Sequence, residues 1–106
     1  MRAPPVFAVA FLTAVPALAD PPQIAITLDA QHFVPSEVPV PAGTKVELLI
    51  KNTGATPAEF ESTPLHREKI VTAGQQISVF VGPLDPGSYE FFDDFHPQIR
   101  GHLVVK

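Results

Sequence analysis

Two residues near the carboxyl end of the chain, Asp93 and His96, are of types that bind metal ions. Aromatic and polar residues alternate around them, which predicts a strand over residues 89–93 that runs into a loop over 94–100. Alternation places Asp93 on the same face as Phe91. If Phe91 points into a core, Asp93 is an inward carboxylate beside a loop histidine, and such a group needs a partner. A metal ion is one such partner, and an Asx-type cap on the loop is the other.

Two glutamates supply a second set of candidate ligands. Glu59 and Glu61 belong to a predicted strand over residues 57–62, and they project from the same strand face, about 7 Å apart. Two carboxylates in this arrangement are either part of a cation site or an ordinary solvated surface. An outer site is a further alternative for Glu61, with His66 and Asp94 as neighbours, since alternation turns Asp94 away from the inward face.

The first nineteen residues have the pattern of a secretory signal peptide. Arg2 supplies a positive charge, residues 6–15 are mostly apolar, and Ala17-Leu18-Ala19 is a small-x-small cleavage signal. The apolar run is shorter than the ~20 residues that a membrane-spanning helix needs. The sequence therefore predicts a signal peptide over residues 1–19, export, and one mature domain over residues 20–106.

Composition narrows the chemistry of the mature domain. Removal of Arg2 from the seven basic residues leaves six against eleven acidic ones, a net charge of −5 with neutral histidines. An acidic surface disfavours nucleic acid and anionic membranes and tolerates cations. The chain has no cysteine, and its one methionine is Met1, so the mature domain offers no soft metal ligand. It also lacks a nucleophile-elbow motif and a glycine-rich phosphate loop, which argues against an ordinary hydrolase.

Short β-prone runs separated by turn residues predict an all-β fold. Pro39 and Pro41 cannot donate to a ladder, so the segment that contains them is expected to be an edge strand. A single helical turn is expected at residues 64–68. Seven to eight short strands with turns every eight to twelve residues are typical of a Greek-key β-sandwich. The predicted strands cover residues 23–29, 38–41, 45–51, 57–62, 68–71, 76–81, 89–93 and 101–106.

The final hairpin resembles that of a cupredoxin, in which cysteine, histidine and methionine ligands are spaced along one loop before a glycine. Phe33-Val34-Pro35 and Asn52-Thr53-Gly54 also resemble segments of such domains. More narrowly, Glu59-Phe60-Glu61-Ser62 and the run over residues 91–96 resemble the EfeO-type cupredoxin-like domains of bacterial periplasmic iron-uptake systems. The resemblance covers nearly all of residues 23–106 and implies a cupredoxin-like sandwich.

The sequence departs from the blue-copper pattern at three ligand positions. Asp93 stands where the cysteine is expected, Glu59 near the place of the first histidine, and Ile99 at that of the methionine. Only His96 keeps its type. Blue-copper electron transfer depends on a copper–thiolate bond, so this chemistry is excluded. The oxygen-rich replacement suits Cu(II), iron or Mn(II) instead.

The resemblance implies a periplasmic protein that binds Cu(II) and/or iron through His96, Asp93 and Glu59. His32 is the expected fourth ligand, because the iron-uptake group has one nearby, and Glu61 is a further candidate. The implied role is to handle or oxidise Fe(II) before it reaches a membrane iron permease, with other periplasmic components as partners. A single metal cannot dispose of the electron, so oxidation would need a partner. Two alternatives remain: a copper carrier or buffer without redox activity, and a metal-free interaction module.

Overall fold

The computed structural model describes residues 2–5 and 20–106. Most of the predicted signal peptide, residues 1 and 6–19, lies outside the described residues, so that assignment stays a prediction. No helix in the described part of the chain has the length and apolar character needed to cross a membrane. The described residues form nine strands: β1 (Gln23–Leu28), β2 (Phe33–Val34), β3 (Glu37–Val40), β4 (Val46–Asn52), β5 (Ala58–Ser62), β6 (Arg67–Val71), β7 (Gln76–Val81), β8 (Gly87–Asp93) and β9 (His96–Val105).

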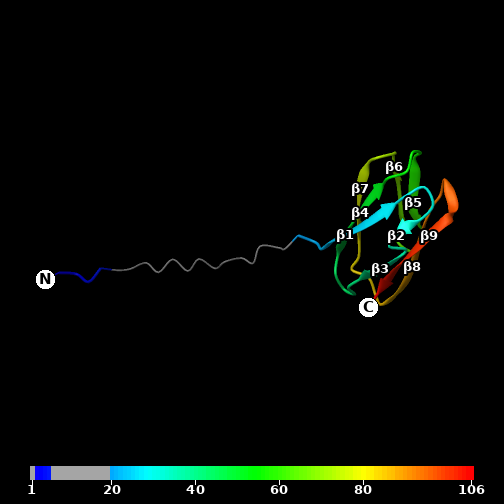
Figure 1. Ribbon diagram of the computed structural model, residues 1–106. Coiled ribbons are helices and arrows are strands. Elements are labelled where there is room, and N and C mark those ends of the chain that lie inside the picture. Colours follow the sequence, from blue (N-terminus) through cyan, green and yellow to red (C-terminus); the bar gives the residue numbers. More distant parts are fainter. Residues whose placement is uncertain (1, 6–19) are drawn as a thin grey trace.

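The strands form two sheets that face each other (Figure 1). One sheet has the order β2-β1-β4-β7, and the other has the order β3-β9-β8-β5-β6. Pairing is parallel between β1 and β4 and between β3 and β9, and the other pairs are antiparallel. The predicted all-β sandwich is confirmed, and β3, which contains Pro39 and is followed by Pro41, lies at a sheet edge as expected.

The structure differs from the predicted strands in three places. Residues 33–34, expected in a connector, form β2 because they pair with the end of β1. The final strand begins at His96 rather than at Gly101, because Asp93 pairs with His96 after a register shift in the β8–β9 ladder. The segment expected to contain a helical turn is a short turn that leads into β6. All three differences lie at short connections, where the chain folds back to pair with the segment just before it: Leu28 with Phe33, Asp93 with His96 and Ser62 with Arg67. Alternation alone does not report where such a connection closes.

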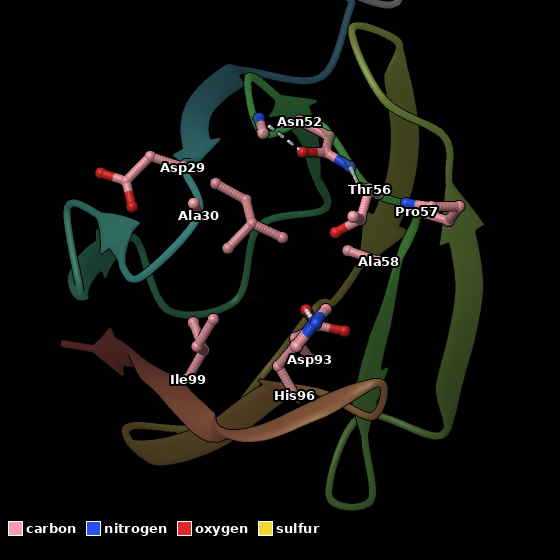
Figure 2. Close-up of a pocket in the computed structure, with 11 residues that line it drawn as sticks. Asp29, Ala30, Asn52, Thr56, Pro57, Ala58, Asp93, His96 and Ile99 are labelled. Carbon is pink, nitrogen blue, oxygen red and sulfur yellow. Dashed lines mark hydrogen bonds and ion pairs between the residues drawn. The ribbon is translucent and has the colours of Figure 1, made fainter.

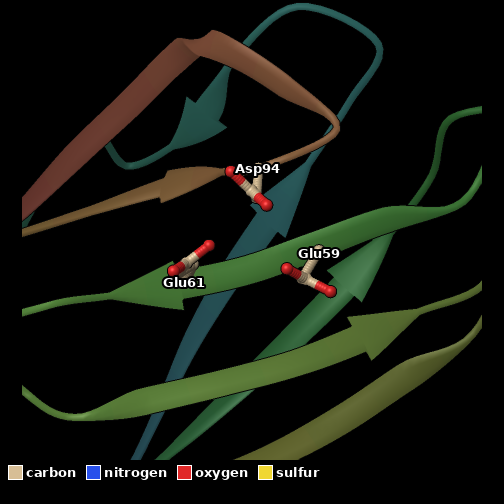
Figure 3. A group of neighbouring side chains, drawn as sticks. All are labelled: Glu59, Glu61 and Asp94. Carbon is tan, nitrogen blue, oxygen red and sulfur yellow. The ribbon is translucent and has the colours of Figure 1, made fainter.

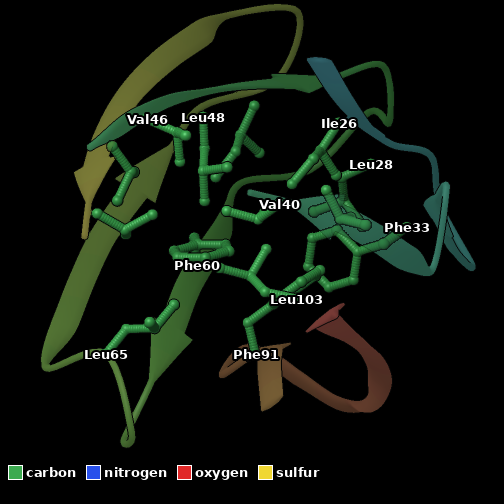
Figure 4. Close-up of a cluster of buried hydrophobic side chains, with 14 of the residues drawn as sticks. Ile26, Leu28, Phe33, Val40, Val46, Leu48, Phe60, Leu65, Phe91 and Leu103 are labelled. Atoms are coloured by element: carbon green, nitrogen blue, oxygen red, sulfur yellow. The ribbon is translucent and has the colours of Figure 1, made fainter. Parts of the chain in front are cut away.

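Alternation along the strands builds the core between the sheets (Figure 4). Phe33, Phe60 and Phe91 are each no more than 2% exposed and pack around one another. The ring centroids of Phe33 and Phe91 are 4.9 Å apart at an interplanar angle of 88°. This is the edge-to-face arrangement that aromatic pairs prefer. Aliphatic residues from both sheets surround this cluster. The aromatic cluster joins β2, β5 and β8, and β5 and β8 carry the candidate ligands.

Candidate functional site

The register between β5 and β8 decides which candidate ligands share a face. Phe60 lies opposite Asp93, and Glu61 lies opposite Phe92. Directly opposed residues in an antiparallel pair project to the same face, so Asp93 points inward with the buried Phe60. Glu61, by the same rule, points to the outer face of the five-stranded sheet. The candidate residues are thus divided between an inner pair and an outer cluster.

The inner pair consists of Asp93 and His96. Asp93 is 1% exposed, and its Oδ1 accepts hydrogen bonds from the backbone N–H groups of Glu59 at 2.9 Å and Phe95 at 3.0 Å. Its Oδ2 lies 2.8 Å from Nδ1 of His96. The Asx-type cap, the alternative to a metal ion at this position, is therefore present. The second carboxylate oxygen is bonded to His96.

A cavity of about 20 Å³ lies beside this pair, which is room for about one water molecule (Figure 2). Ala58 and Ile99 supply apolar surface to its wall, and Asn52 supplies an amide. Asn52 is itself fully engaged by backbone partners: its Nδ2 donates to the carbonyls of Thr56 and Val71, and its Oδ1 accepts from Gly54. The remaining lining residues are Leu28, Asp29, Ala30, Gly54, Thr56, Pro57, Asp93 and His96.

These residues do not fit the copper centre of a blue-copper protein. The chain has no thiolate to form the copper–sulfur bond on which that centre depends. The inward-facing residue at the start of β5 is Ala58, which has no donor atom, and Ile99 is equally inert. Asp93 and His96 remain as donors, and they are hydrogen-bonded to each other. The inner position therefore offers one carboxylate and one imidazole that are already bonded to each other rather than a ready coordination sphere.

The outer cluster consists of Glu59, Glu61 and Asp94. One carboxylate oxygen from each residue lies within 4.8 Å of the others (Figure 3). Glu59 is largely buried, Glu61 is half-buried and Asp94 is exposed, so the cluster opens to solvent on one side. The donors come from one strand and from the β8–β9 turn, which backbone pairing holds together. Three oxygen ligands at this spacing suit a hard cation.

Electrostatic strain accompanies this arrangement. Loss of hydration raises the pKa of Glu59 above its ordinary value of 4.5, and repulsion from Glu68 and Asp94 raises it further. Loss of hydration also raises the pKa of Glu61, with repulsion from Asp94 and Glu68 as the next causes. Glu68 is therefore a fourth carboxylate near the cluster, as expected from its pairing opposite Glu61. A cation bound among these oxygens would relieve the repulsion.

The structure does not bring the five predicted ligands into one site. Glu59 contributes only its backbone N–H to the inner pair, because its side chain projects from the opposite face of the sheet. The expected grouping of Glu59 with Asp93 and His96 is therefore not found. His32 is largely exposed at 70% and lies 3.7 Å from Asp29, and it does not line the inner cavity. Metal binding by these residues stays a prediction.

The sequence suggested an outer site formed by Glu61, Asp94 and His66, and the structure brings two of these three residues together. Glu61 and Asp94 do lie together, and Glu59 joins them. His66 lines a neighbouring hollow that Glu61 and Glu68 also border, but it is outside the cluster. Alternation along β5 had already put Glu59 and Glu61 on one face, and the burial of Phe60 between them identifies that face as the outer one.

Two sequence comparisons place the chain among known proteins. The sequence model of the family described as Cupredoxin-like domain matches residues 4–105. An uncharacterized protein of Rickettsia prowazekii (strain Madrid E) is 45% identical over 84 residues, which is 78% of this chain and 67% of that protein.

Solved structures with the same fold include several copper proteins. Auracyanin A, a blue copper protein of Chloroflexus aurantiacus, superposes with a TM-score of 0.68 at 17% identity, covering 81% of this chain and 99% of that one. Amicyanin of Paracoccus versutus gives a TM-score of 0.64 at 20% identity and 86% of each chain. The metal-binding domain of the Cu(I)-exporting ATPase CopA of Streptococcus pneumoniae gives 0.71 at 17% identity, covering 85% and 91%. The match over residues 4–105 and this shared architecture show that the chain belongs to the cupredoxin-like domain family.

Proposed function

We propose that this protein is an exported, periplasmic cupredoxin-like protein that binds a hard metal cation at its outer carboxylate cluster and assists iron uptake. The observation that carries the proposal is the meeting of Glu59, Glu61 and Asp94, whose carboxylate oxygens lie within 4.8 Å of one another. Family membership supports a metal-binding role in general. The choice of iron rests on the donor chemistry and on the EfeO-type resemblance of these segments.

Carboxylate oxygens favour cations of high charge, so the cluster would hold Fe(III) more tightly than Fe(II). That preference lowers the potential of bound iron and favours loss of an electron from Fe(II). The electron must pass to an acceptor on a partner, since the inner pair does not fit a copper centre. The proposed cargo is iron on its way to a membrane permease, with Cu(II) as a competing cation.

Glu68 strengthens the cluster as a cation site. It adds a fourth carboxylate whose charge raises the pKa of both Glu59 and Glu61. Four carboxylates near one point of a folded sheet repel one another, and binding of a cation removes this cost. The repulsion destabilises the metal-free protein, and its relief on binding therefore increases the affinity for the cation.

Calorimetric titration of the purified protein tests the proposal, with Fe(II) under anaerobic conditions and Cu(II) in separate experiments. Glu59→Gln with Glu61→Gln should weaken binding of the cognate cation at least about tenfold, or 1.4 kcal/mol. Glu37→Gln is the matched control, because Glu37 is an exposed carboxylate on β3 of the same sheet. The control should bind like the wild type.

Three results would redirect the assignment. Equal binding by the double variant and the wild type would show that the cluster is not the metal site. Tight Cu(II) binding with no response to Fe(II) would favour the copper carrier or buffer. Failure of any cation to bind, or to raise the melting temperature, would favour the metal-free interaction module, since only ligands of the native state stabilise it.

A further inference from the structure

We propose that Asp93 is a positioning residue whose carboxylate clamps Glu59 to the β8–β9 turn and so sets the geometry of the outer carboxylate cluster. The proposal rests on the function assigned above to that cluster. It gives a role to the position where a blue-copper protein has its cysteine: Asp93 acts from the inner face on a site at the outer face.

Both backbone groups of Glu59 are bonded to this turn. Its N–H donates to Oδ1 of Asp93 at 2.9 Å, and its carbonyl accepts from the N–H of Asp94 at 2.9 Å. The same Oδ1 accepts from the N–H of Phe95 at 3.0 Å, which ties the turn to itself. The backbone of Glu59 is thereby held against the turn that carries Asp94, and these two residues belong to the cluster.

His96 completes the clamp from the other side. Its Nδ1 lies 2.8 Å from Oδ2 of Asp93, so both carboxylate oxygens have partners within the protein. No buried side-chain nitrogen or oxygen among residues 2–5 and 20–106 lacks a hydrogen-bond partner. Asp93 is 1% exposed, so beyond the single water that the neighbouring cavity can hold, solvent cannot replace these bonds when one is lost. The clamp is a satisfied internal network rather than an open set of ligands.

Binding of a cation depends on where the carboxylate oxygens lie, whereas hydration of surface carboxylates does not. Metal–ligand distances are specified to about ±0.2 Å, so a small displacement of one carboxylate removes it from the coordination sphere. Glu59 and Asp94 come from separate segments, β5 and the turn, and the clamp adds side-chain bonds to the pairing between these segments. Loss of the clamp would let the start of β5 move away from the turn.

Asparagine at position 93 distinguishes a clamp from a metal ligand. Its Oδ1 can accept the same two backbone N–H groups, and its Nδ2 can donate to Nδ1 of His96 in the neutral Nε2–H tautomer. Asp93→Asn therefore preserves all three hydrogen bonds while it removes the negative charge. A metal ligand depends on that charge, whereas a clamp does not.

The experiment measures Fe(II) affinity by anaerobic calorimetry for the full protein and its variants. Asp93→Ala should weaken binding at least tenfold, and Asp93→Asn should remain within about threefold of the wild type. Asp29→Ala is the matched control: Oδ1 of Asp29 also accepts two backbone N–H groups, from Gln31 and His32, in a turn away from the cluster. Its loss should lower the melting temperature without changing the affinity.

Each outcome decides the proposal. A tenfold loss in Asp93→Asn would identify Asp93 as a ligand and overturn the clamp. Unchanged affinity in Asp93→Ala would show that the cluster needs no clamp. If Asp93→Ala does not fold, Asp93→Ser takes its place, because its hydroxyl restores at most part of the network. The Glu59→Gln, Glu61→Gln double variant separates failure of the clamp from failure of the proposed metal site. It binds Fe(II) like the wild type only if the cluster is not the site.

Discussion

Glu61 shares the outer face with Glu59 and Asp94, so its carboxylate repels its neighbours as long as no cation lies between them. Lost hydration and this repulsion raise its pKa above 4.5. Between 4.5 and the raised native value the folded protein binds more protons than the unfolded chain, so this group lowers stability as pH rises through that window. In metal-free protein at pH 7, Glu61→Gln should therefore melt at a higher temperature than the wild type.

The advantage of Glu61→Gln should disappear below pH 4.5, where the carboxyl is protonated in both states. It should reverse at pH 7 with saturating cation, because the wild type gains more from the bound metal. Melting curves by circular dichroism at both pH values, with and without cation, measure all three effects. A variant that stays more stable in excess cation would contradict the assignment of Glu61 to the site.

At the scale of single elements, β6 and β7 are end strands of different sheets, and side chains close the gap between them. Arg67 donates through Nε to the carbonyl of Phe80 at 2.9 Å, and Lys69 donates through Nζ to that of Ser78 at 3.1 Å. The cations thus cover backbone acceptors that an unpaired edge would present to another chain. Arg67→Ala with Lys69→Ala should promote concentration-dependent self-association, measured by sedimentation velocity.

The control for this pair is Lys51→Ala, which removes an exposed cation from β4. It changes the net charge without uncovering the edge of β7, so it should stay monodisperse to the same concentration as the wild type. Equal association by the control would assign the effect to charge rather than to the open edge.

The β8–β9 ladder depends on a glycine opposite the aromatic core. A Cβ at Gly101 would lie 2.6 Å from Cζ of Phe91 and 2.7 Å from the carbonyl oxygen of Ser36. Neither the buried ring nor the backbone can yield freely. Gly101→Ala should therefore lower the free energy of unfolding by about 2–3 kcal/mol, as overpacked cores do. Urea denaturation measures the loss, and a value below about 0.5 kcal/mol would show that β9 can shift at no cost.

At the scale of the whole molecule, Asn52 connects the two sheets. It ends β4, and its Nδ2 donates to the carbonyl of Val71 at the end of β6, at 3.1 Å, and to that of Thr56 at 2.8 Å. Aspartate has the same shape but cannot donate, and it would place a buried charge against two carbonyl oxygens. Asn52→Asp should cost at least about 2 kcal/mol of unfolding free energy.

Urea unfolding of Asn52→Asp also reports on cooperativity. An unchanged m-value would show that both sheets still unfold together, and a reduced m-value would show that one sheet loosens first. Substitutions at ordinary surface positions change stability by roughly 0.5 kcal/mol or less. An effect of Asn52→Asp within that range would contradict the bridging role.

Alternation and turn chemistry in the sequence by themselves determined the all-β sandwich, the edge position of β3 and the inward direction of Asp93. These are local properties, since a strand's two faces follow from its period of two. The same period held enough information to place Glu59 on the outer face with Glu61. The resemblance to blue-copper ligand spacing instead grouped Glu59 with Asp93.

Only the tertiary structure decided which segments meet. The register of β5 against β8 puts Asp93 beneath the sheet and Asp94 above it, next to carboxylates 33 and 35 positions earlier in the chain. The shift in the β8–β9 ladder sets His96 opposite Asp93 and turns Ile99 inward. The β5–β8 pairing depends on contact energies between residues far apart in the chain, and the ladder shift depends on how the β8–β9 turn closes, so alternation along a single strand encodes neither. For this reason the sequence named nearly all the candidate residues, whereas the fold divided them into an inner pair and an outer cluster.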